Sequence, residues 1–110
     1  MTGLCEGAGV FDGATCGAAT GERTQALLKA QELEVVRLVL RKGRRLPRHA
    51  APGEITLLGL EGRMDLLLDD GVVPLLPGRL VHLAAGAPHA VRAAEDSAAL
   101  LTMSLLTRRP

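Results

Sequence analysis

Aromatic side chains are nearly absent from this chain of 110 residues, which has one Phe and no Tyr or Trp. Hydrophobic residues nevertheless make up 47% of the sequence, so the core must consist of Leu, Val and Ala. With a single aromatic side chain, stacking on sugars or on single-stranded nucleic acid is hard to arrange. The net charge of +1 provides no global positive field either. We therefore expect no nucleic-acid partner.

Cysteines and long apolar runs are also scarce. The two cysteines, Cys5 and Cys16, have a spacing that matches no zinc motif. No stretch approaches the ~18 apolar residues of a membrane span, and the first residues lack the basic start and apolar run of a signal peptide. We expect a cytoplasmic protein with reduced thiols and no membrane partner.

Common catalytic motifs are missing as well. There is no glycine-rich phosphate loop with a lysine, no cysteine quartet and no serine in a nucleophile elbow. Residues 1–22 are rich in glycine, which gains little from burial, so we predict an N-terminal arm or tail there. Residues 23–110 then form one domain. Within it, residues 24–32 would form a short helix by propensity.

From residue 34 onward the pattern changes to that of strands. Residues 34–41 alternate, with Val36, Leu38 and Leu40 on one face. After them, turn signals separate short apolar segments at 55–60, 63–68, 72–76, 79–84, 89–93 and 97–106. Closely spaced turns of this kind are typical of a β-sandwich or β-barrel. We predict an all-β chain of about eight antiparallel strands that hides its edges by closing into a barrel.

Two blocks of the sequence resemble the two motifs of the cupin superfamily. In the first block, Gly43 precedes His49 by six positions, and Gly62 matches the glycine that closes the motif. The second block matches at Gly78, Gly86 and His89. Ala84 and Ala93 replace the proline and the asparagine of the family pattern. The resemblance covers roughly residues 33–107 and implies a jelly-roll β-barrel, commonly a homodimer.

The same resemblance implies a metal site, from which this chain departs. His49 and His89 match two of the family's ligands, and the alternation of strand side chains would bring them to one end of the barrel. The second histidine of the first motif falls at Ala51, and the acidic ligand falls at Ile55 or Thr56. Glu54 is the one acidic residue nearby, and it would complete a set of two histidines and one carboxylate.

The metal question therefore stays open at this stage. The site could hold one divalent transition metal (Zn, Fe, Mn or Ni), or the two histidines could be hydrogen-bonded pocket residues without metal. Further candidates for the ligand pocket are His82, Arg48, Thr56 and Met64. The basic run at residues 41–48 is either a solvated turn or a clamp for a phosphate or carboxylate.

Three functions remain from these observations. The first is a protein that binds a small molecule in the barrel lumen, which a lining of Leu, Val and Ala favours. The alternative is a metal-dependent enzyme, similar to a dioxygenase or an isomerase, that uses His49, His89 and Glu54. The third is a structural dimer in which the N-terminal arm is exchanged between subunits.

Overall fold

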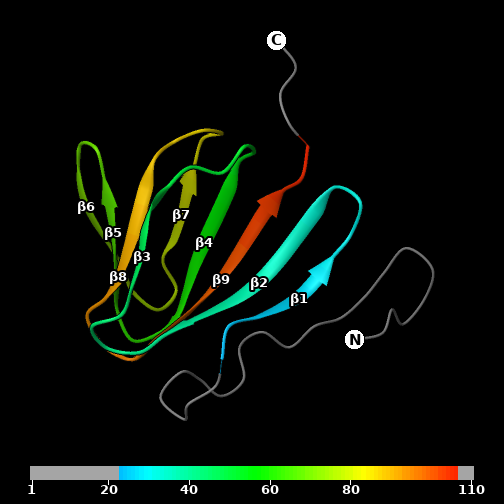
Figure 1. Cartoon of the computed structure of the whole chain (residues 1–110). Helices are drawn as coiled ribbons and strands as arrows, with labels where there is room; N and C mark the ends of the chain where they lie inside the picture. The colour runs from blue at the N-terminus through cyan, green and yellow to red at the C-terminus, as the bar shows by residue number, and fades with distance from the viewer. Residues whose placement is uncertain (1–22, 107–110) are drawn as a thin grey trace.

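A computed structural model describes residues 23–106 of the chain (Figure 1). This part of the chain contains no helix and forms nine strands. Their bounds are β1 Gln25–Lys29, β2 Leu33–Leu40, β3 Arg45–His49, β4 Ile55–Glu61, β5 Met64–Leu68, β6 Gly71–Leu75, β7 Leu80–Leu83, β8 His89–Ala93 and β9 Ser97–Ser104. The apolar segments expected from the turn signals correspond to β4 through β9.

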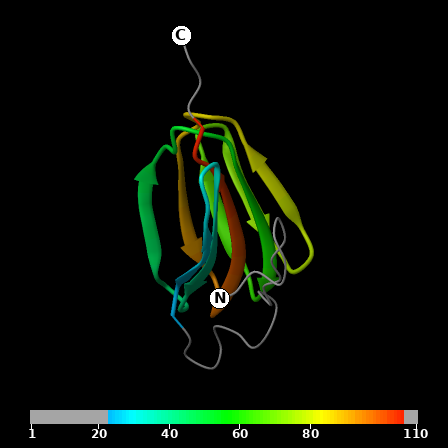
Figure 2. The same cartoon turned by 90° about the vertical axis from the view of Figure 1, so that its right-hand side faces the viewer.

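The strands form two antiparallel sheets. One sheet has the order β1-β2-β9-β4-β7 and the other the order β3-β8-β5-β6. Figure 2 shows the two sheets face to face, with β3 and β8 on one side and β4 and β7 on the other. The prediction of an all-β jelly-roll is thus confirmed.

The core lies between the two sheets and is aliphatic, as the lack of aromatic residues requires. Along β4, the inward Ile55 and Leu57 are buried, whereas the intervening Thr56 is half-buried. Leu66 of β5 and Ala99 of β9 are fully buried from opposite sheets. Burying side chains of this size is the main favourable term in folding.

The helix predicted for residues 24–32 is wrong, because β1 occupies Gln25–Lys29 and pairs with β2. Thr24, just before β1, strengthens this pairing. Its hydroxyl donates to the carbonyl of Val39 at 3.1 Å and accepts the N–H of Val39 at 2.8 Å. Cross-strand hydrogen bonds outweigh the weak helix propensity of this segment. The predicted arm at residues 1–22, with its two cysteines, lies outside the described residues.

Glycine is required at Gly62, in the tight turn between β4 and β5. Gly62 has a φ of +66°, a left-handed conformation that costs an L-residue roughly 1–2 kcal/mol. A Cβ atom here would also lie 2.2 Å from the carbonyl oxygen of Asp96. Gly78 has a φ of +85°, but a Cβ atom there would meet nothing within 4 Å.

This difference predicts different costs for the same substitution. Gly62→Ala should lower the free energy of unfolding by about 1–3 kcal/mol more than Gly78→Ala, because it adds an overpacking cost to a similar backbone cost. Urea denaturation followed by circular dichroism measures both variants. Equal losses would show that the Asp96 carbonyl moves aside without cost.

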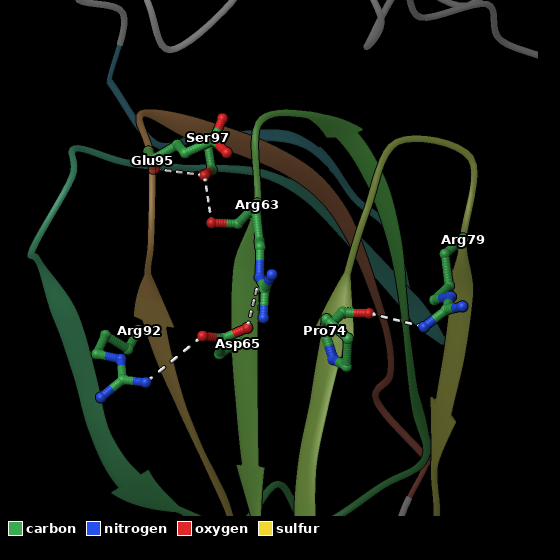
Figure 3. A network of polar contacts seen from close by, with 7 residues as sticks. All are labelled: Arg63, Asp65, Pro74, Arg79, Arg92, Glu95 and Ser97. Carbon is green, nitrogen blue, oxygen red and sulfur yellow. Dashed lines mark hydrogen bonds and ion pairs between the residues drawn. The ribbon is translucent and has the colours of Figure 1, made fainter.

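Asp65 is a buried carboxylate on the outer face of the β3-β8-β5-β6 sheet (Figure 3). Its Oδ1 accepts from Nε of Arg63 at 3.0 Å, and its Oδ2 lies 3.5 Å from a guanidinium nitrogen of Arg92. The Asp65 side chain is 8% exposed, whereas the two arginines are about half exposed. The two guanidinium groups thus compensate for the burial of the carboxylate.

We expect Asp65→Asn to destabilise the fold by about 1–2 kcal/mol, because an amide replaces a charged acceptor beside two arginines whose exposure weakens the effect. Asp70→Asn, in the exposed turn between β5 and β6, is the matched control and should stay within about 0.5 kcal/mol of the parent. Thermal unfolding of both variants tests this expectation. Equal midpoints would mean that the ion pairs contribute nothing to stability.

Candidate functional site

A β-bulge in β3 determines which of its side chains faces the core. Leu46 pairs with Val91 and His49 pairs with His89, so β3 carries one residue more than β8 between these two pairs. Regular pairing would have placed Arg48 opposite His89. Pro47 lies within this bulge, and β3 is an edge strand, where a residue without an N–H is tolerated.

The bulge brings the two histidine rings together at one end of the barrel. Their centroids are 4.4 Å apart, and their planes are inclined by 57°. His89 is 4% exposed, whereas His49 is exposed. His49 is the last residue of β3, and His89 is the first residue of β8.

Backbone carbonyls fix the tautomer of both rings. Nδ1 of His49 lies 2.9 Å from the carbonyl oxygen of Pro47, and Nδ1 of His89 lies 3.1 Å from that of Ala87. A carbonyl oxygen only accepts, so each Nδ1 carries the hydrogen and each neutral ring keeps the lone pair of its Nε2 free. The same arrangement is common in histidines that ligate metals.

The Nε2 atom of His89 also reaches the solvent. Among the described residues, no fully buried side-chain nitrogen or oxygen lacks a hydrogen-bond partner. Nε2 of His89 has no such partner, so it cannot be fully buried although the residue as a whole is. Two imidazole nitrogens with free lone pairs are therefore available at this end of the barrel, which we call the histidine end.

The structure does not group Glu54 with the two histidines. Oε1 of Glu54 accepts from Nε2 of His82 at 2.7 Å, and both side chains are more than half exposed. His82 alternates with the buried Leu83 and pairs with Thr56, so it lies on the outer surface rather than lining the barrel. Within residues 23–106, no three His, Cys, Asp or Glu side chains are grouped as a metal site would need.

The other pocket candidates are separate from one another. Arg48 is exposed and forms an ion pair with Asp69 at 2.9 Å. Thr56 faces outward beside His82, because its neighbours Ile55 and Leu57 are buried. Met64 is 1% exposed in the core, at the opposite end of β5 from Leu68, the residue paired with His89. Sequence reasoning did not anticipate the carbonyls that orient the two histidines.

Comparison with known proteins identifies the family. The family model described as the cupin domain matches residues 36–105, and the chain belongs to this family. No curated protein matches the sequence. The expected homodimer and cytoplasmic location remain predictions. No helix in residues 23–106 is long and apolar enough to span a membrane.

Solved structures share the fold. SPY1581 of Streptococcus pyogenes, a conserved protein of unknown function, is 27% identical, with a TM-score of 0.71 over 77% of this chain and 75% of that one. The DMSP lyase DddQ of Ruegeria pomeroyi is 25% identical, with a TM-score of 0.70 over 87% of this chain and 55% of the lyase. KdgF of Halomonas sp. is 19% identical, with a TM-score of 0.68 over 78% and 80% of the two chains.

The three histidines should differ in tautomer. We expect neutral His49 and His89 to carry the ring hydrogen on Nδ1, because each Nδ1 faces a carbonyl. His82 should carry it on Nε2, because a carboxylate oxygen faces that atom. Long-range ¹H–¹⁵N correlation spectra of uniformly labelled protein distinguish the two tautomers. An Nε2–H form at His49 and His89 would contradict the assignment.

Proposed function

We propose that this cupin binds a small molecule at the histidine end of its barrel, with Nε2 of His49 and Nε2 of His89 as the polar anchor. The observation that carries the proposal is the pair of Nδ1–carbonyl hydrogen bonds, which leave both Nε2 atoms free. The aliphatic side chains packed nearby, among them Leu46, Leu68 and Ala87, suit a ligand with an apolar portion.

The two histidines fit a divalent transition metal as two of its ligands. The two rings lie close together, with centroids 4.4 Å apart, and their Nδ1–carbonyl hydrogen bonds leave both Nε2 lone pairs for a metal. His49 and His89 would hold the metal, and the bound molecule or water would complete its coordination.

When bound, such a metal would act as a Lewis acid that polarises an oxygen of the ligand. The chain's own residues contribute orientation. The carbonyls of Pro47 and Ala87 hold the two rings in the tautomer with the hydrogen on Nδ1. Burial of His89 limits the contact of its ring with water. The small side chain of Ala51 leaves the family's third histidine position without a ligand.

An enzymatic role is the second candidate, and the 25% identity to a DMSP lyase favours it. An enzyme of this kind would need a general base and a fuller ligand set than two imidazoles. Glu54 is engaged with His82 on the outer surface, so it supplies neither. Binding without turnover therefore accounts better for the residues at the histidine end.

Metal titration tests the anchor. We expect Zn²⁺ or Ni²⁺ to bind at about one ion per chain in isothermal titration calorimetry, and His49→Ala with His89→Ala to abolish that binding. Glu54→Gln is the matched control and should leave stoichiometry and affinity unchanged, because Glu54 pairs with His82. No binding to the parent protein would remove the metal from the proposal. Direct binding of ligands would then be tested by NMR at His89.

A gain of affinity provides the complementary test. Ala51→His restores the histidine that the family pattern has at this position, and a third imidazole should raise Zn²⁺ affinity by at least about tenfold. Ala51 is partly buried against the core, and its carbonyl accepts the N–H of Gly86 at 2.8 Å, which the substitution preserves. Unchanged affinity in a folded Ala51→His variant would show that position 51 does not reach the metal.

A further inference from the structure

A hollow lies at the opposite end of β3 from His49. Its volume is about 370 Å³, and it is lined by Arg23, Thr24, Val39, Leu40, Arg41, Arg44 and Arg45. We call it the arginine hollow. Arg45 and His49 are the two ends of β3, so their backbone positions are about 13 Å apart along the strand. The hollow is a separate feature from the histidine end.

The four arginines of the hollow have no carboxylate partner among the described residues. Three carboxylates pair with arginines that do not line the hollow. Glu61 pairs with Arg37, Asp69 with Arg48, and Asp65 with Arg63 and Arg92. The carboxylate of Asp96 accepts the backbone N–H of Lys42 at 2.8 Å rather than an arginine. Within residues 23–106, the hollow therefore gathers four arginines that form no ion pair, on a chain whose net charge is only +1.

The pairing of β3 with β8 brings a further positive charge close to the hollow. Arg45 lies directly opposite Arg92 in the β3–β8 pair, and like charges in that arrangement repel. Asp65 offsets the charge of Arg92 at 3.5 Å, but Arg45 has no such neighbour within residues 23–106. An anion bound beside Arg45 would relieve the repulsion.

The backbone around the hollow is held in place by hydrogen bonds. The turn at Arg41–Arg44 is closed by a bond from the N–H of Arg44 to the carbonyl of Arg41 at 2.9 Å. The N–H of Gly43 donates to the carbonyl of Ala93, and the N–H of Ala93 donates to the carbonyl of Arg44, both at 2.9 Å. Thr24 fixes the opposite wall through its two bonds to Val39. The guanidinium groups thus project from a preorganised frame.

We propose that the arginine hollow binds a small phosphate ester. Guanidinium groups pair with phosphate oxygens in a bidentate manner, and several arginines around one hollow suit a doubly charged group. The hollow is larger than a phosphate ion requires, and Val39 and Leu40 provide an apolar wall for the organic portion. The residues that line the hollow include no aromatic side chain, which argues against a stacked nucleobase.

Calorimetry at low ionic strength with glycerol 3-phosphate tests the proposal, with glycerol as the uncharged control. We expect glycerol 3-phosphate to bind and glycerol not to bind. Arg41→Gln with Arg44→Gln should weaken binding by at least about tenfold. Arg48→Gln with Arg79→Gln removes the same charge outside the hollow and should change affinity by less than about threefold, since long-range effects are screened.

Two further readouts separate specific binding from general attraction. Backbone amide signals of Thr24, Leu40 and Arg44 should shift in NMR titrations, while that of His89 should not. A second pair, Arg23→Gln with Arg45→Gln, should repeat the loss of affinity and covers the case in which the first pair fails to fold.

Several results would overturn the proposal. One is the absence of glycerol 3-phosphate binding up to about 10 mM, where any specific site of this charge should be detectable. Another is an equal loss of affinity in the control pair outside the hollow. A third is tighter binding of a DNA oligonucleotide through the same amides, which would assign the hollow to nucleic acid instead.

Discussion

The pairing of β3 with β8 is the interaction on which both candidate sites depend. It joins Arg45 to Arg92 at one end and His49 to His89 at the other. The hydrogen bonds between Gly43, Arg44 and Ala93 extend the pairing into the preceding turn. Because β3 is an edge strand, β8 is its one neighbour in the sheet. Loss of this pairing would disrupt both the histidine end and the arginine hollow.

The aliphatic core imposes a consistent chemistry on the molecule. With no Tyr or Trp, the two candidate sites rely mainly on imidazole and guanidinium groups. Imidazole is found beside the apolar interior, where His89 is almost fully buried. Guanidinium groups are found on the exposed turn between β2 and β3, where their charge stays solvated. Under the two proposals, the histidine end suits a ligand with a hydrogen-bond donor or a bound metal, and the arginine hollow suits a phosphate.

The fold and the closeness of His49 and His89 could be predicted from the sequence because their signals are local. Glycines that take positive φ, such as Gly62, leave a recognisable spacing, and the two histidines lie in those same blocks. Features that depend on pairing between distant parts of the chain could not be predicted from the sequence. The strand β1 depends on β2 for its hydrogen bonds, Glu54 faces outward because of its register with β7, and the arginine hollow requires Arg23 to meet a turn about 20 residues later.

The extra residue in β3 has a consequence for how this site could change during evolution. A substitution at position 49 removes one imidazole, whereas deletion of Pro47 would restore regular pairing and still leave His49 opposite His89. The pair of imidazoles therefore survives a change of length in β3. Related cupins could differ by one residue at this point of β3 and keep both histidines paired. An alignment that closes such a gap would match the wrong side chains.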